Sequence, residues 1–170
     1  GFVVAYGQDA VKTIGPIKLY PGVRNHYVVR KGLSNSQKLQ VALGIFVDVS
    51  LQFEGTQNSW LARMLTGTDS GFSEEDLVSD LIGFYKALNP NLDVDKLCKP
   101  VSVDASRRVW DRDGPVGQNK NKSFTPRFHK CDECNDQQPR FPQQFQMVAP
   151  AKKGDLFDNW MPPPPTYYGI

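Results

Sequence analysis

The stretch from Leu39 to Phe53 constrains the fold more than any other part of the chain, because it is mostly apolar and carries one charge, Asp48. Apolar residues recur there at steps of three and four, which keeps them on one helical face: Leu39, Ala42, Phe46, Val49 and Phe53. Further apolar residues fill most of the other faces: Val41, Leu43, Ile45, Val47 and Leu51. A helix that is apolar nearly all round is covered on several sides. We therefore predict a central helix over about 34–58.

Both helices with strong signals begin at a recognisable cap. Ser34 followed three residues later by Gln37 is a capping box, which satisfies amides that the first helix would otherwise leave unpaired. The second helix is predicted over 73–89, with Ser73 as its cap and acidic residues in its first turn, where the helix dipole favours negative charge. Pro90 ends it, because proline disfavours the helical conformation in the preceding residue.

The remaining chain is less regular. Short runs rich in β-branched and aromatic residues alternate with glycine and proline over residues 1–33, which predicts short strands. Two shorter helices are predicted around 93–98 and around 103–112, the latter capped by Ser102. Nine of the thirteen prolines follow Gly114, interleaved with aromatic residues, so this part predicts an irregular segment that wraps onto the helical core or a partner.

These elements predict an α+β fold with a mainly helical core, short N-terminal strands and a long, irregular, proline-rich C-terminal segment. We expect a globular core over residues 1–113 and a wrapping segment of the same domain over 114–170. A length of 170 residues fits one domain.

Charge and composition exclude several classes of protein. The net charge of +2 is too small to indicate nucleic acid as a partner, although seven basic residues lie within 107–130. We expect that run to be a solvated loop rather than a phosphate-binding surface. No stretch reaches the length of about 18 apolar residues that a membrane span needs. Glycine-rich phosphate loops, a G-x-S-x-G elbow and an H-E-x-x-H helix are absent from the sequence. Three cysteines, an odd number, leave the compartment open.

The most suggestive metal-binding pattern is the H-x-C-x-x-C cluster formed by His129, Cys131 and Cys134. Two thiolates separated by two residues can hold one zinc ion from a tight turn. Cys98 can supply the fourth ligand, with His26 or a carboxylate as substitutes. A local disulfide between Cys131 and Cys134, or free thiols in a loop, are the alternatives. The pattern thus predicts a structural zinc ion as the one cofactor.

The catalytic candidates are carboxyl groups. Glu54 lies near the end of the first helix, beside apolar residues and the amide of Gln57, where a carboxyl group can acquire the pKa of a general acid or base. A solvent-facing glutamate is the alternative. Asp76 and Asp80 share one face of the second helix and can pair with Glu54 or bind a cation. His26, between two arginines, can serve as a base or an anion contact, although a lone histidine beside a strand is more often structural.

The segment Ser70-Gly-Phe-Ser-Glu-Glu-Asp-Leu-Val-Ser-Asp-Leu-Ile-Gly83 resembles the F-S-x-E-D-L-x-S-N-L-x-G segment of an uncharacterised bacterial domain family. In that family an upstream helix carries a His-Glu pair. Glu54 matches the glutamate, but Phe53 stands at the place of the histidine, and Asp80 replaces the family's asparagine. The resemblance, which covers residues 54–83, implies that Glu54, Asp76 and Asp80 face one cleft. The missing histidine puts a metal-dependent activity there in doubt.

Two functions follow from these features. The first is a non-catalytic interaction or assembly subunit, whose C-terminal aromatic and proline-rich segment binds a protein partner and whose zinc cluster stabilises that segment. The alternative is a hydrolase-like enzyme in which Glu54 is the general acid or base, and Asp76, Asp80 and His26 assist it. The sequence favours the first, because its supporting features extend over more than fifty residues.

Overall fold

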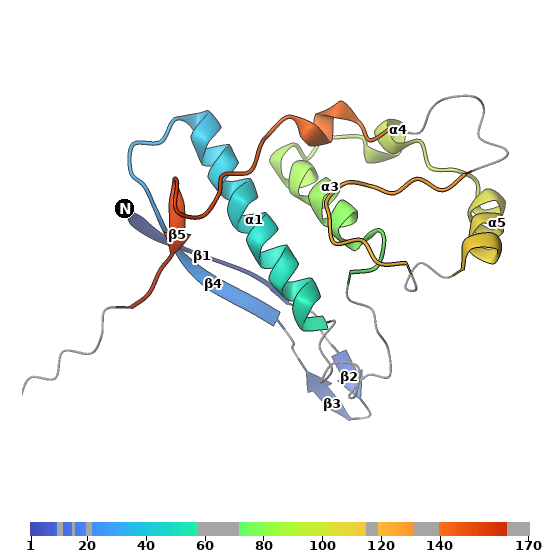
Figure 1. Ribbon diagram of the computed structural model, residues 1–170, viewed down its shortest axis with the longest axis horizontal. Coiled ribbons are helices and arrows are strands. Elements are labelled where there is room, and N and C mark those ends of the chain that lie inside the picture. Colours follow the sequence, from blue (N-terminus) through green and yellow to red (C-terminus); the bar gives the residue numbers. More distant parts are fainter. Residues whose placement is uncertain are drawn as a thin grey trace, which may run out of the picture.

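A computed structural model describes residues 1–9, 12–14, 16–19, 22–57, 72–114, 119–130 and 140–162. The predicted α+β class is confirmed: one long helix, α1 (Asn35–Gln57), crosses a small antiparallel sheet, and the other helices lie on the far side of α1 (Figure 1). These helices are α3 (Asp76–Leu88), α4 (Val94–Cys98) and α5 (Val103–Asp113). None of the helices in the described ranges is long and apolar enough to cross a membrane.

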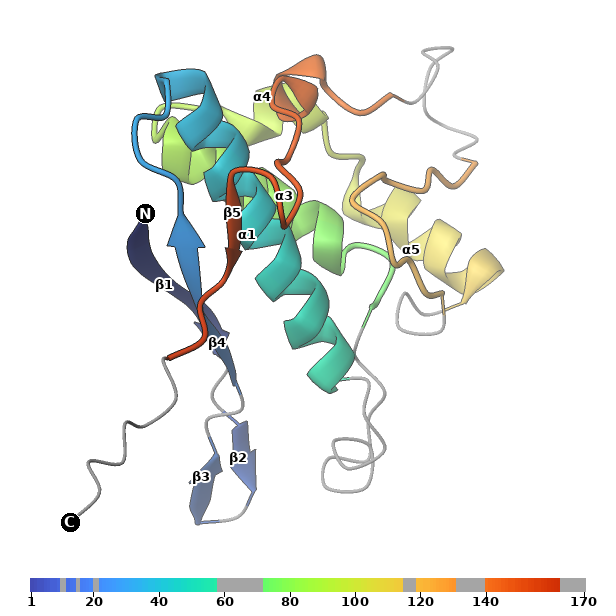
Figure 2. The same cartoon turned by 60° about the vertical axis from the view of Figure 1, so that its left-hand side comes forward.

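The sheet joins the two ends of the chain. Strands β1 (Phe2–Asp9) and β4 (Gly22–Val29) pair antiparallel, and β5 (Phe157–Asn159) adds to the other edge of β4, beside which it lies in Figure 2. A separate hairpin of β2 (Lys12–Ile14) and β3 (Ile17–Leu19) extends beyond them. Side chains alternate across β4, so Tyr27 and Val29 are buried while His26 and Val28 are exposed. The sheet therefore has one covered and one open face.

The capping box at the start of α1 is present in full. The Gln37 backbone N–H donates to Ser34 Oγ at 3.2 Å, and the Ser34 N–H donates to Gln37 Oε1 at 2.9 Å. Two otherwise orphaned amides are thereby satisfied, which fixes where the helix begins. The prediction of a helix over 34–58 is confirmed over Asn35–Gln57, and residue 58 lies outside the described residues.

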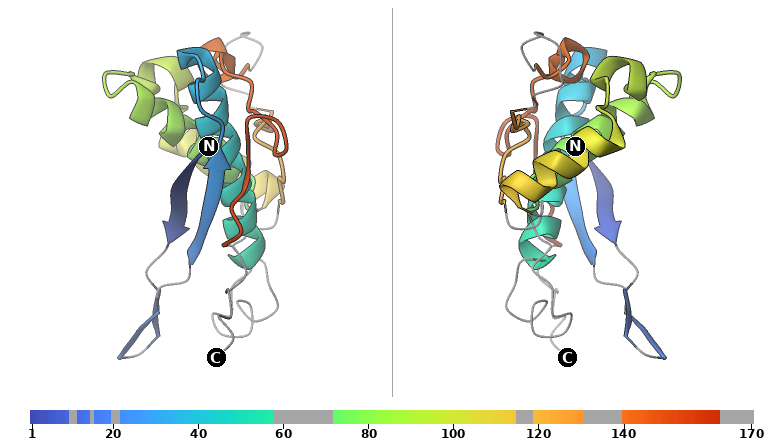
Figure 3. Two further views of the ribbon diagram at one scale, coloured as in Figure 1. Left: turned by 90° about the vertical axis from the view of Figure 1, so that its left-hand side faces the viewer. Right: turned by 90° about the vertical axis from the view of Figure 1, so that its right-hand side faces the viewer.

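Helix α1 separates two hydrophobic cores, as a helix with several apolar faces should. The first core lies between α1 and the sheet and consists of Tyr27, Val29, Val41, Ile45, Val49 and Phe157. The second lies between α1, α3 and the short 3₁₀ helix η2 (Gln143–Gln146) and consists of Leu43, Phe46, Leu81, Tyr85 and Phe145. The two layers lie on either side of α1 in Figure 1, and Figure 3 views the molecule from the sheet side on the left and from the side of α5 on the right.

One part of the predicted stripe of α1 is not covered. Leu39 and Ala42 are exposed, because neither core reaches that side of the first helical turns. On the opposite side the packing is close at Gly44, where an added Cβ would lie 2.4 Å from the carbonyl oxygen of Ala151 and 2.9 Å from the Phe157 ring. Glycine at this position lets the segment that leads into β5 lie directly on the helix backbone.

Helix α3 begins at Asp76 rather than at the predicted Ser73. Ser73 instead forms an isolated antiparallel bridge with Lys120, which draws residues 73–75 away from the helix. The Asp76 carboxylate accepts the Ser73 N–H at 2.8 Å, so this acid caps the turn from within. The two shorter helices are confirmed, with caps at Asp93 and Ser102 whose side chains accept the Lys96 and Ala105 amides.

The C-terminal segment contributes to both cores. Phe145 of η2 is 2% exposed and packs against Tyr85, whose hydroxyl accepts the Val148 N–H at 3.2 Å. Phe157 of β5 is 4% exposed and meets Tyr27 edge-to-face. The segment thus crosses from the helical side of the molecule to the sheet.

Candidate active site

The last turns of α1 carry a buried acid, Glu54, which is only 5% exposed. Its Oε2 atom accepts the backbone N–H of Phe72 at 2.8 Å. A buried carboxyl group that is ionised costs several kcal/mol unless it is well compensated, so such groups are uncommon outside functional sites. The structure places Glu54 inside the protein rather than at a solvent-facing rim.

Asp76 and Asp80 reach Glu54 from α3, as their spacing of four residues on one helical face allows. Burial is the main cause that raises the pKa of Glu54, to about 7, and the negative charges of Asp76 and Asp80 raise it further. The hydrogen bond from Phe72 acts in the opposite direction. A side-chain hydrogen bond with Asp76 also raises the pKa of Glu54.

Asp80 is held by polar side chains from two other elements. Hydrogen bonds from Ser50 of α1 and Gln8 of β1 lower its pKa, but burial outweighs them and the net shift is upward. The Gln8 amide also donates to Ser50 Oγ at 2.9 Å, and Ser50 is fully buried. Gln8 Oε1 is the one buried side-chain nitrogen or oxygen atom in the described ranges that lacks a hydrogen-bond partner. An unsatisfied acceptor of this kind is typical of sites that retain strain or bind a donor.

The amide that binds Glu54 comes from a strained residue. Phe72 has a φ of 58°, in the left-handed region that residues with a Cβ rarely adopt. Its side chain is nevertheless buried, at 8% exposed. Backbone strain of about 1–3 kcal/mol persists only where the surroundings enforce it, and it concentrates at functional sites. The strained turn before α3 thus directs the Phe72 amide at the Glu54 carboxylate.

This cluster can move a proton near neutral pH. A carboxyl group with a pKa of about 7 is present in both its acidic and basic forms there, so it can donate or accept a proton without a large free-energy cost. Asp76 accepts the Ser73 N–H as well, which fixes its orientation toward Glu54. The three carboxyl groups lie near one another, and the expectation that they face one cleft stays a prediction.

The structure does not bring His26 to this cluster. His26 lies on the open face of the sheet, where its ring contacts that of Trp160 at a centroid distance of 5.8 Å, whereas α1 covers the other face. The side chain of Gln57 lies outside the described residues.

Cys131 and Cys134 also lie outside the described residues, so the zinc cluster stays a prediction. Of the other two expected ligands, Cys98 lies at the end of α4 with its side chain partly accessible, and partial burial together with Asp95 raises the pKa of its thiol. Both ring nitrogens of His129 are occupied by carboxylates. Among the described residues no group of three or more His, Cys, Asp or Glu side chains is arranged to hold a metal ion.

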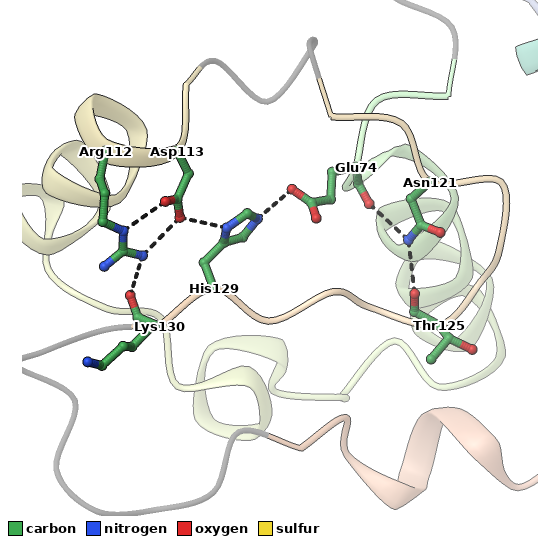
Figure 4. A network of polar contacts seen from close by, with 7 residues as sticks. All are labelled: Glu74, Arg112, Asp113, Asn121, Thr125, His129 and Lys130. Atoms are coloured by element: carbon green, nitrogen blue, oxygen red, sulfur yellow. Dashed lines mark hydrogen bonds and ion pairs between the residues drawn. The ribbon is translucent and has the colours of Figure 1, made fainter.

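A second polar network, which the sequence did not predict, surrounds His129 (Figure 4). His129 Nε2 lies 2.6 Å from Glu74 Oε2, and Nδ1 lies 2.8 Å from Asp113 Oδ2. The two carboxylates raise the pKa of His129, while the neighbouring Arg112 and His129 lower that of Asp113 to about 2. An imidazolium between two carboxylates thus joins the start of α3 to the end of α5.

A mostly apolar cavity of about 750 Å³ borders this network, with Trp110, Val78 and Val109 among its lining residues. Arg107 and Arg127 from the basic run also line it, but acidic groups of the network balance their charge.

Comparisons with family models, with curated proteins and with solved structures find no match for the chain. The resemblance of residues 54–83 to a bacterial domain family therefore stays a prediction, and the argument for function depends on the site itself.

Proposed function

We propose that the protein is a hydrolase-like enzyme in which Glu54 is the general acid and base. The observation that carries this proposal is the buried Glu54 carboxyl group, whose pKa is raised to about 7 beside two further acids. Burying Glu54 beside two partly buried acids costs folding stability, and a structural role alone would be served better by apolar or amide side chains. Perturbed acids of this kind concentrate at catalytic sites.

The residues around Glu54 have distinct roles in this proposal. Hydrolysis requires that one proton be taken from the attacking water and that one be given to the leaving group. Glu54 does both in turn, because its pKa lies near neutral pH. The Phe72 amide fixes Oε2, and the side chain of Asp76 bonds to the carboxyl group and orients it. Asp80, held by Ser50 and Gln8, keeps the local charge negative and thereby keeps the pKa of Glu54 high.

The test is a screen of the purified chain with chromogenic esters, anilides and glycosides between about pH 5 and about pH 9. We expect hydrolysis of at least one class, with an inflection in the rate near the pKa of Glu54, about 7. Glu54→Gln keeps the shape and the acceptor for the Phe72 amide but cannot exchange a proton, so the rate should fall by about 100-fold or more.

The matched control is Asp155→Asn, the same acid-to-amide change at an exposed acid outside the site. This variant should retain the activity of the parent chain. Absence of hydrolysis in every class, or a Glu54→Gln variant as active as the parent, would contradict the proposal.

A second proposal, the interaction or assembly subunit, has its own support. Met161 and Met147 are 82% and 74% exposed, and Trp160 is partly exposed beside the open face of the sheet. These side chains belong to the segment that we expect to bind a protein partner, and exposed apolar groups are common at such surfaces.

Metal analysis of the purified chain tests the zinc ion that this second proposal includes. One tightly held zinc ion that is lost in Cys131→Ser, together with a lower melting temperature, would support it. A metal-free chain with the same melting temperature would remove the zinc from the proposal. Sedimentation analysis distinguishes a self-associating chain from a monomer. If the exposed Met161 takes part in self-association, Met161→Asp should shift the chain toward the monomer.

A further inference from the structure

The turn that donates the Phe72 amide to Glu54 is held from its other side by a segment distant in sequence. The backbone N–H of Asn121 donates to the Phe72 carbonyl at 3.0 Å, and Asn121 Nδ2 donates to the Glu74 carbonyl at 3.3 Å. The same Nδ2 donates to the Thr125 carbonyl at 2.9 Å, as Figure 4 shows. Asn121 is 2% exposed, so these bonds are shielded from water.

His129 holds the same turn through a side chain. Its Nε2 atom lies 2.6 Å from Glu74 Oε2, and Asp113 fixes the opposite ring nitrogen. Arg112 donates to both Asp113 and the Lys130 carbonyl, which ties the end of α5 to the residue after His129. The Glu74 backbone carbonyl thereby bonds to Asn121, and its side-chain carboxylate bonds to His129.

These contacts explain how Phe72 keeps its unfavourable backbone conformation. Asn121 bonds the Phe72 carbonyl, Glu54 accepts the Phe72 amide, and Lys122 Nζ lies 5.3 Å from the centre of the Phe72 ring. A strained residue persists when its neighbours over-determine its position. Asn121 itself is fixed, because its Oδ1 atom accepts both the amide and the hydroxyl of Ser123.

We infer that Asn121 and His129 are positioning residues of the Glu54 site: they hold the turn of residues 72–76 against Glu54 and so keep this carboxyl group buried beside Asp76. The inference rests on the proposed role of Glu54. Neither residue touches the carboxyl cluster, and each acts through the turn. Releasing the turn admits water to Glu54 and moves Asp76 away from it, which removes the two main causes of its unusual titration.

The readout is the titration of the Glu54 carboxyl carbon, followed by ¹³C NMR and assigned by its absence from the Glu54→Gln spectrum. In His129→Gln the side chain no longer bridges two carboxylates, and we expect the pKa of Glu54 to fall from about 7 toward its ordinary 4.5. The matched control is His26→Gln, the same change at the other histidine of the chain, on the open face of the sheet. It should leave the Glu54 titration unchanged.

A second variant, Asn121→Asp, keeps the size of the side chain but replaces the donor to the Glu74 and Thr125 carbonyls with an acceptor. It should lower the pKa of Glu54 in the same direction. Circular dichroism checks that each variant is folded, and if Asn121→Asp unfolds, His129→Gln decides, because His129 lies outside both hydrophobic cores.

An unchanged Glu54 titration in folded His129→Gln would overturn the inference. The NMR measurement needs no substrate, so the positioning role can be tested independently of the enzymatic activity. A shifted titration in a chain without hydrolytic activity would contradict the enzyme and support the positioning role. Hydrolytic activity whose pH profile is the same in the parent and in His129→Gln would support the enzyme and contradict the positioning role.

Discussion

The body of helix α1 and its last turns are built on opposite principles. Its middle and first half pack apolar side chains between the sheet and α3, with Val49 fully buried and Phe157 at 4% exposure. Its last turns place Glu54 against Asp76 and a strained turn. The first region gains stability from burial, and the second loses it by burying charge. A difference of this kind within one helix separates the part that holds the fold from the part available for chemistry.

The largest expected effect tests the apolar region. Phe157→Ala should lower the free energy of unfolding by about 3–5 kcal/mol, because it leaves a cavity between Tyr27 and α1. Chemical denaturation measures this loss. Phe2→Ala is the matched control, since Phe2 is 49% exposed at the start of β1, and its effect should be less than about 1 kcal/mol. Equal losses in both variants would mean that the first core does not carry the stability assigned to it.

The next effect tests the carboxyl cluster through pH. Because folding raises the pKa of Glu54 from 4.5 to about 7, its protonated form stabilises the fold below about pH 4.5, and this contribution is lost as the pH rises through about 7. The loss amounts to at most about 3 kcal/mol. Glu54→Gln stays neutral, so its unfolding free energy should lack this decline and exceed that of the parent above pH 7.

Urea denaturation across this pH range provides the measurement. Asp155→Asn, a change at an exposed acid, should keep the slope of the parent chain. If Glu54→Gln and the parent had parallel profiles, Glu54 would titrate as an ordinary surface acid, and the contrast between the body of α1 and its last turns would disappear.

The smallest effect tests the exposed start of α1. Ser34→Ala removes the side chain that accepts the Gln37 amide and should cost about 1 kcal/mol, seen as a small decrease in melting temperature. Ser36→Ala, a nearby exposed serine inside the helix, should have almost no effect. A loss at Ser34 as large as that at Phe157 would show that the cap, rather than the core, determines whether α1 forms.

The elements whose signals are local were predictable. The capping box and the apolar periodicity identify α1 within its own sequence, and Asp93 and Ser102 mark the two short helices in the same way. The common face of Asp76 and Asp80 follows from helical spacing, and their meeting with Glu54 was expected from the family resemblance.

Contacts between distant segments were not predictable from one sequence. His129 and Glu74 are 55 residues apart, and the bridge between Ser73 and Lys120 that delays the start of α3 joins segments of different local character. The close packing at Gly44 likewise depends on where the C-terminal segment crosses α1. No spacing rule relates such residues, because the folded backbone alone brings them together.

Because α1 forms a wall of both cores, neither half of the molecule has a complete interior of its own. If the sheet unfolded, the side of α1 that faces it would be exposed to water, and α1 would be a less stable partner for α3. If α3 unfolded, the other side of α1 would be exposed, and α1 would be a less stable partner for the sheet. The two halves should therefore melt together, in a single transition, even though one is a sheet and the other a set of helices. Cooperativity in this chain comes from one shared element rather than from a broad interface.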